Sequence, residues 1–145
     1  MEYISNSADE TYEIASRFAK QLNKGDIITL DGDLGAGKTA FVRGLADGLG
    51  LSDMVVSPTF TIVNEYRHGD VPLFHFDVYR LECDDDLYDI GWDDYCGNDG
   101  ICVVEWSKIM PEVFFMPHYS INITKDMSVS EDYRIITIDF VGGTK

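Results

Sequence analysis

The residues best suited to chemistry in this chain form one glycine-rich run that ends in lysine and threonine. The run consists of Gly32, Asp33, Leu34, Gly35, Ala36, Gly37, Lys38 and Thr39. It matches the phosphate-binding P-loop pattern G-x-x-x-x-G-K-T. Glycines let successive backbone N–H groups converge on one anion, so we expect the whole run to bind nucleotide phosphates. Lys38 is expected to reach the β- and γ-phosphates, and Thr39 to offer its hydroxyl to Mg²⁺.

The segments on either side of this run have the pattern that a P-loop requires. Residues 27–30 are short, apolar and mostly β-branched, which predicts a buried strand. Residues 40–49 carry apolar side chains at helical spacing, and the N-terminus of such a helix adds partial positive charge at the phosphate position. A strand, a glycine-rich turn and a helix in this order favour a real P-loop over a chance glycine turn.

Two acids lie where P-loop enzymes hold Mg²⁺ or orient its water, at the carboxyl ends of apolar runs. Asp77 closes residues 74–77, and Glu105 closes residues 101–105. A carboxylate at the end of a buried strand is costly unless a cation meets it, so both are candidate catalytic and metal-binding residues. The structural alternatives are a helix cap or an ion pair with Arg80 or Lys108.

Three further residues have weaker patterns. Thr59 follows the P-loop helix, where a γ-phosphate sensor would lie, and is a candidate catalytic residue. Trp106 follows Glu105 and is a candidate contact to the base, with core packing as the alternative. His75 alternates with Asp77 along the same strand, where a buried, hydrogen-bonded histidine is expected.

The remaining pattern predicts the rest of an α/β domain. Ser7 and Glu10 have the spacing of a capping box that opens a helix. Residues 60–66 and 73–79 are predicted to form a hairpin, residues 84–95 a short acidic helical element, and residues 119–124 and 133–140 a closing antiparallel hairpin. We expect residues 1–145 to form a single P-loop NTPase domain. Its mixed sheet should have a parallel core, antiparallel hairpins and helices on both faces.

Composition limits the classes of partner. The net charge is −15, from 26 acidic and 11 basic residues. Such a chain repels phosphate backbones at long range, which argues against direct RNA binding and makes Mg²⁺ close to obligatory for ATP. No apolar run approaches the length of a membrane helix. Three cysteines without a C-x-x-C pair and no secretory signal favour a reduced protein in the cytoplasm.

Several ordered motifs together resemble the TsaE (YjeE) family of small bacterial P-loop ATPases. Besides the P-loop, they are residues 57–60 (S-P-T-F), 75–80 (H-F-D-V-Y-R), 86–91 (D-L-Y-D-I-G) and 104–106 (V-E-W). The resemblance implies an ATPase that acts with a TsaD–TsaB pair in making threonylcarbamoyladenosine in tRNA, with tRNA held by the partners. It also implies that Lys38, Thr39, Thr59, Asp77 and Glu105 belong to the active site, and that ATP and Mg²⁺ are the cofactors.

Other nucleotide-dependent functions are weaker alternatives. A small-molecule kinase usually closes an arginine-bearing lid over the transferred phosphate, but the five arginines here are scattered along the chain. A non-hydrolysing, nucleotide-gated interaction module would have no need for Asp77 and Glu105. Asn23–Asp26 fits a guanine-reading box but lies just before the P-loop, so it is interpreted as a turn that ends a helix. We therefore expect adenine to be preferred over guanine.

Overall fold

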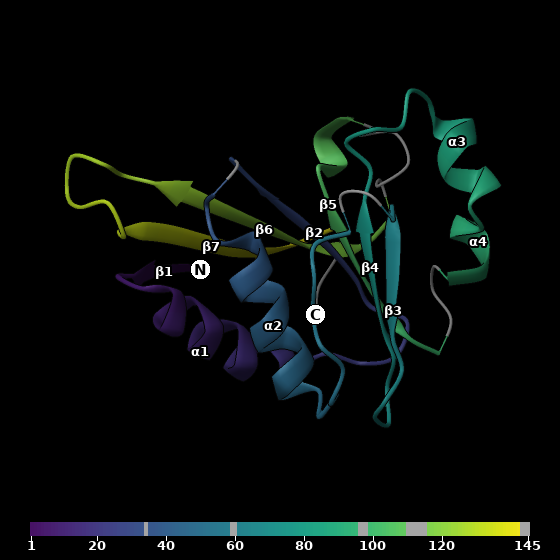
Figure 1. Cartoon of the computed structure of the whole chain (residues 1–145), viewed down its shortest axis with the longest axis horizontal. Helices are drawn as coiled ribbons and strands as arrows, with labels where there is room; N and C mark the ends of the chain where they lie inside the picture. Colours follow the sequence, from purple (N-terminus) through teal and green to yellow (C-terminus); the bar gives the residue numbers. More distant parts are fainter. Residues whose placement is uncertain (34, 59–60, 96–98, 110–115, 143–145) are drawn as a thin grey trace.

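The computed structural model describes residues 1–33, 35–58, 61–95, 99–109 and 116–142 (Figure 1). Its strands are β1 (Glu2–Ser5), β2 (Ile27–Gly32), β3 (Val63–Tyr66), β4 (Leu73–Asp77), β5 (Ile101–Glu105), β6 (His118–Lys125) and β7 (Arg134–Val141). Its helices are α1 (Ala8–Ala19), α2 (Lys38–Gly48), α3 (Asp84–Asp89) and α4 (Trp92–Tyr95), with a 3₁₀ turn, η1, at Ser107–Ile109.

All of these strands join one mixed sheet in the order β1-β7-β6-β2-β5-β4-β3. The four central strands β6, β2, β5 and β4 run parallel. Antiparallel pairs flank them on both sides, since β3 pairs with β4 and β7 pairs with both β6 and β1. The predicted α/β class, with a parallel core and antiparallel hairpins, is confirmed.

Helices α1 and α2 cover one face of this sheet and lie against each other (Figure 1). Ser7 caps α1 by accepting a hydrogen bond from the Glu10 N–H at 3.1 Å, as its spacing predicts. The two helices approach closely at Gly44 of α2, where an added Cβ would lie 2.3 Å from the Tyr12 carbonyl oxygen and 2.7 Å from the Ala15 Cβ. Glycine and alanine at this contact therefore let α2, which follows the P-loop, pack tightly against α1.

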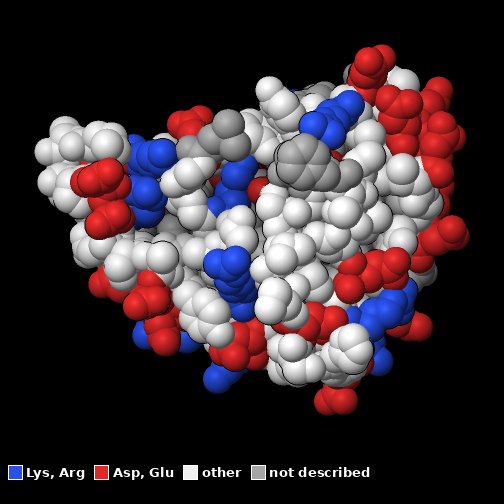
Figure 2. Space-filling model, in the orientation of Figure 1, with Lys and Arg blue, Asp and Glu red and all other residues white. Residues whose placement is uncertain are grey.

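The short helices α3 and α4 cover the opposite face near β4. Alternate residues of the strands face this second core, which is filled by Leu87 of α3 and Trp92 of α4. The Trp92 ring packs edge-on against Phe76, with ring centroids 5.1 Å apart. The acidic side chains of α3 and α4 point outward and form the red rim at the right of Figure 2. The prediction of helices on both faces is confirmed.

The structure differs from the sequence-based expectation at two places. The strand expected at residues 60–66 begins only at Val63, because the Ile62 N–H donates to the Pro58 carbonyl at 2.7 Å and Ile62 has a φ of 71°. This turn overrides the β-branched side chains of Thr61 and Ile62, while Phe60 lies outside the described residues. Strand β1 was not predicted at all, because its pairing partner, β7, lies at the other end of the chain.

The sheet register places the candidate acids next to one another. Asp77, the last residue of β4, is the Cα partner of Glu105, the last residue of β5. Glu105 is in turn paired with Leu30 of β2, which leads directly into the P-loop. The carboxyl ends of three parallel strands therefore meet beside the P-loop, as expected for a ligand site in an open α/β sheet. In the described part of the chain, every helix is too short or too polar to cross a membrane.

Candidate functional site

The P-loop has the backbone conformation that anion binding requires. Gly35 and Gly37 have φ angles of 76° and 105°, a left-handed region that other residues adopt at a cost. Gly37 is the N-cap of α2, and no side chain caps the first N–H groups of that helix. Those N–H groups and the helix dipole are therefore directed at the space in front of the loop. Behind the loop, Arg134 of β7 donates to the carbonyls of Ala36 at 3.0 Å and Gly35 at 3.3 Å.

Lys38 is a buried cation in unusual surroundings. Its side chain is only 7% exposed, and its Nζ atom lies 3.8 Å from Glu105 Oε1 and 3.8 Å from the centre of the Trp106 ring. The ammonium group has no hydrogen-bond partner among the described residues. Burial lowers the pKa of Lys38, and the nearby carboxylates, Glu105 foremost, oppose that shift. A buried donor without an acceptor is costly, so the site has a place for an anionic ligand.

The two candidate acids are both buried beside this lysine. Asp77 and Glu105 are each 4% exposed. Asp77 accepts a hydrogen bond from the Tyr79 N–H at 2.9 Å. Glu105 contacts Lys38 through Oε1 and the His75 ring through Oε2. The alternative that Glu105 pairs with Lys108 is wrong, because Lys108 binds Asn122 instead.

These residues suit a magnesium ion that arrives with phosphates. Mg²⁺ is usually held by one or two carboxylates together with substrate phosphates and water. Thr39, Asp77 and Glu105 all line one cavity and supply the oxygen ligands that Mg²⁺ prefers. No group of three or more His, Cys, Asp or Glu side chains in the described segments is arranged to hold a metal by itself. The donor set therefore fits a nucleotide-bound ion better than a permanent metal centre.

This cavity, which we call the P-loop cavity, encloses about 290 Å³. It is lined by Gly35, Gly37, Lys38, Thr39, Ser57, Asp77, Glu105 and Trp106. Most of the residues predicted from the P-loop and the strand ends are thus brought together. Ala36 instead points into the core and is fully buried. Leu34 and Thr59 lie outside the described residues, but Ser57, two residues before Thr59, reaches the cavity wall.

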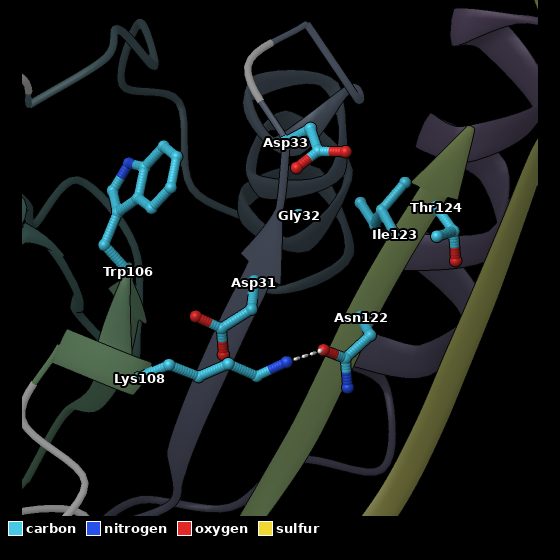
Figure 3. A pocket seen from close by; sticks show the side chains of 8 residues that line it. All are labelled: Asp31, Gly32, Asp33, Trp106, Lys108, Asn122, Ile123 and Thr124. Carbon is cyan, nitrogen blue, oxygen red and sulfur yellow. Dashed lines mark hydrogen bonds between the residues drawn. The ribbon is translucent and has the colours of Figure 1, made fainter.

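A second cavity, shown in Figure 3, shares Trp106 with the P-loop cavity. This β6-side cavity encloses about 320 Å³ and is lined by Asp31, Gly32, Asp33, Trp106, Lys108, Asn122, Ile123 and Thr124. In Figure 3, the Lys108 ammonium extends under the cavity and donates to Asn122 Oδ1 at 3.2 Å. Asp31 accepts a hydrogen bond from Ser107 Oγ at 2.8 Å. Gly32 and Asp33 of the P-loop therefore face this cavity and not the P-loop cavity.

Trp106 is shared by the two cavities, and its backbone turns sharply after β5. Its φ is 65°, a conformation unusual for a residue other than glycine, and such conformations often occur at functional sites. The indole is half-buried, packs against Tyr79 with ring centroids 4.9 Å apart, and borders both cavities. Trp106 also packs against the second core, so core packing, the alternative role, accounts for part of this position.

Sequence reasoning missed most of the β6-side cavity. Asp31 had a usable pattern, since it follows an apolar run just as Asp77 and Glu105 do. Lys108 and Asn122 had no such sequence pattern, because nothing in the residues around them shows that the two side chains are in contact.

The chain matches the family model described as "Threonylcarbamoyl adenosine biosynthesis protein TsaE" over residues 5–135. Among curated proteins, it is 45% identical to "tRNA threonylcarbamoyladenosine biosynthesis protein TsaE" of Bacillus subtilis, covering 92% of this chain and 82% of the relative. It is 40% identical to the protein of the same name from Treponema pallidum, covering 95% and 99% of the two chains. Among solved structures, it resembles Bacillus subtilis YdiB with a TM-score of 0.82 at 38% identity, covering 98% of this chain and 86% of that chain. Since the match spans nearly the whole sequence and the fold, this chain belongs to the TsaE family.

Proposed function

We propose that this chain is an ATPase that binds and hydrolyses ATP with Mg²⁺. The observation that carries the proposal is the buried Lys38 ammonium group, which has no hydrogen-bond partner among the described residues. Lys38 is also the first residue of a helix whose N-terminus no side chain caps. A phosphate placed there would accept hydrogen bonds from Lys38 and from the P-loop N–H groups. It would also relieve the cost of burying the ammonium group, which supports nucleotide phosphates as the ligand.

The side chains of the P-loop cavity would divide the work of hydrolysis. Lys38 would hold the β- and γ-phosphates and offset the negative charge that spreads over the transferred group. Thr39, with Asp77 or Glu105, would hold Mg²⁺, which when bound neutralises further phosphate charge. The other carboxylate would orient the attacking water. The new bond joins the water oxygen to the γ-phosphorus, and the bond from that phosphorus to the β–γ bridging oxygen breaks. ADP leaves with the electron pair, and the proton of the attacking water passes to the carboxylate that orients it.

The base of the nucleotide is proposed to occupy the β6-side cavity. Its volume of about 320 Å³ lies within the range of small-ligand sites. Trp106 offers an aromatic surface for stacking on one side, while Lys108 and Asn122 offer polar groups at the floor (Figure 3). Adenine is the proposed base, as the sequence predicts.

The relatives' names support a role in tRNA threonylcarbamoyladenosine (t⁶A) biosynthesis, and we propose that this chain acts there with a TsaD–TsaB pair in the cytoplasm. A net charge of −15 leaves little means of holding tRNA directly, since phosphate contacts supply most non-specific affinity. The chain would therefore dock on proteins that hold the tRNA and use ATP to change their state. Thr59, after Ser57 at the cavity wall, is proposed as the γ-phosphate sensor.

Multiple-turnover phosphate release, measured with and without a TsaD–TsaB pair, tests the proposed activity. We expect hydrolysis by the wild-type chain to be stimulated by the pair, and hydrolysis at limiting ATP to fall in Lys38→Ala, which should bind ATP more weakly. Phosphate release limited to a single equivalent would instead favour a nucleotide-gated module. Transfer of the γ-phosphate to a small molecule would favour a kinase.

The proposed partnership has its own test. Binding to tRNA alone should be negligible at physiological salt, whereas binding to the TsaD–TsaB pair should differ between ATP, ADP and no nucleotide. Thr59→Ala should weaken that dependence on nucleotide more than it weakens nucleotide affinity. Equal recovery of the complex in all three nucleotide states would contradict the proposed switch.

A further inference from the structure

A buried row of polar side chains crosses three strands and ends at Glu105. His75 of β4 has no exposed surface. Its Nε2 atom is hydrogen-bonded to Glu105 Oε2 of β5, and its Nδ1 atom lies 3.3 Å from the hydroxyl oxygen of Tyr66 on β3. The Tyr66 hydroxyl donates to the Val56 carbonyl at 2.9 Å and accepts from the Val56 N–H at 3.2 Å. The row therefore joins an active-site carboxylate to the segment that leads into Ser57.

The apolar residues beside His75 on β4 and β5 do not call for a histidine at this position. The cross-strand neighbour of His75 on β5 is Val103, which is fully buried and apolar. Leu73, two residues earlier on the same face of β4, is also apolar and fully buried. Burying an imidazole among such side chains is costly unless both nitrogens are satisfied. Because burying His75 is costly and its apolar neighbours do not require it, we look for its role in the contact with Glu105.

A neutral His75 imidazole has one tautomer that fits this row. An ionised Glu105 carboxylate can only accept, so the proton lies on His75 Nε2 and Nδ1 is the acceptor. Burial raises the pKa of Tyr66, so its hydroxyl keeps a proton that it can direct to Nδ1 or to the Val56 carbonyl. That carbonyl also accepts from Asn64 Nδ2 at 3.1 Å, so it keeps a hydrogen bond in either case.

The two oxygens of Glu105 consequently have different tasks. Oε2 is held by His75, while Oε1 faces Lys38 Nζ at 3.8 Å and borders the P-loop cavity. The terminal torsion of a glutamate is broad and roughly two-fold, so without His75 the carboxylate plane is free to turn. We propose that His75 is a positioning residue, which fixes the Glu105 carboxylate so that Oε1 faces the reaction space, and that Tyr66 links this orientation to the Val56–Ser57 segment. The role in hydrolysis rests on the ATPase function proposed above.

Four variants test this proposal in the full-length chain. His75→Phe keeps a ring but removes both nitrogens, and His75→Gln returns an amide nitrogen near the position of Nε2. Tyr66→Phe removes only the hydroxyl. The matched control is His118→Gln, because His118 is also a buried histidine of this sheet but lies at the start of β6, away from the carboxyl ends of the strands.

The first readout is the single-turnover hydrolysis rate at saturating ATP, together with the ATP dissociation constant and the thermal unfolding of each variant. Outer-sphere partners of this kind typically contribute about 10–100-fold. We expect His75→Phe to lower the rate by that factor with little change in ATP affinity. His75→Gln should restore most of the rate, Tyr66→Phe should have a smaller effect than His75→Phe, and His118→Gln should match wild type. A wild-type rate in His75→Phe would overturn the proposal. A loss that follows thermal destabilisation and is not rescued by glutamine would also overturn it.

The second readout needs neither nucleotide nor activity. In the nucleotide-free protein labelled with ¹⁵N-histidine, NMR should show a downfield His75 Nε2–H proton protected from exchange. The resonance should vanish in His75→Gln and shift in Glu105→Ala, but persist in His118→Gln. If the wild-type chain fails to hydrolyse ATP even with its partners, the proposed function fails, and this spectrum still decides whether His75 holds Glu105. The absence of a protected proton would overturn the positioning role.

Discussion

The two cavities that share Trp106 are built in different ways. The P-loop cavity takes half of its lining from one continuous motif, and its charged groups, Lys38, Asp77 and Glu105, come from adjoining ends of β4, β5 and α2. The β6-side cavity combines side chains from β2, η1 and β6. The P-loop cavity is suited to binding phosphate groups through backbone N–H groups. The β6-side cavity is suited to recognising the shape of a base and a few of its polar groups. On the proposed function, charge binding and base selection would therefore vary separately in this protein.

The largest expected effect is the loss of chemistry when an acid of the P-loop cavity is removed. Glu105→Ala and Asp77→Ala should each lower the hydrolysis rate by about 10²–10³, as removal of one preorganised electrostatic group typically does. Nucleotide affinity should change much less. The rates are measured by single-turnover phosphate release, with the exposed Asp139→Ala of β7 as control. If both acid variants hydrolyse ATP normally, the acids are structural.

Lys38→Ala should give the next largest effect, which is a loss of ATP affinity. Hydrogen bonds to charged groups contribute about 1.5–3 kcal/mol each, so ATP affinity should fall by at least about 10-fold. The fold should remain intact, because Lys38 makes no hydrogen bond within the described part of the chain. Calorimetric titration measures the affinity, and Lys24→Ala in the turn before β2 is the matched control. If Lys38→Ala bound ATP with wild-type affinity, the proposal that Lys38 holds the nucleotide phosphates would be wrong.

A change in the β6-side cavity should have a smaller and more selective effect. The wild-type chain should bind ATP and ADP more tightly than GTP and GDP. Asn122→Ala removes the partner of Lys108 and one polar group of the proposed base site, at a typical cost of about 0.5–1.5 kcal/mol per hydrogen bond. The preference for ATP over GTP should narrow, while hydrolysis at saturating ATP should hardly change. Competition titration with both nucleotides measures this, and an unchanged preference would place the base elsewhere.

The smallest expected effect is on the pH dependence of stability without nucleotide. Burial lowers the pKa of Lys38 in the folded chain, so the folded state pays to hold the charge below that pKa. The cost is relieved as pH rises through the folded pKa toward the unfolded value. Compared with Lys38→Met, wild type should therefore gain stability toward alkaline pH, by a few degrees in Tm, on the order of the shift given by 1 kcal/mol. Melting curves of both proteins across this range provide the measurement, and parallel curves would contradict the prediction.

Sequence alone predicted the parts of the molecule that depend on near neighbours. The P-loop, the cap at Ser7 and the buried run that ends in Glu105 each involve residues a few positions apart, so their patterns are visible in the chain. The error at residues 61–62 has the opposite cause, an interaction that the local sequence pattern does not show. A turn closed by the Pro58 carbonyl overrode the strand preference of Thr61 and Ile62, and propensity does not register such a hydrogen bond.

Only the tertiary structure decided which side chains that are distant in sequence share a site. Sequence determined that Asp77 and Glu105 end buried strands, because an apolar run that finishes in an acid can be recognised within a single segment. The pairing of those strands placed the two acids side by side, brought His75 onto Glu105 across 30 positions, and set Lys108 against Asn122. The physical reason is that register in a sheet is chosen by the burial of whole faces, a property of all the strands together.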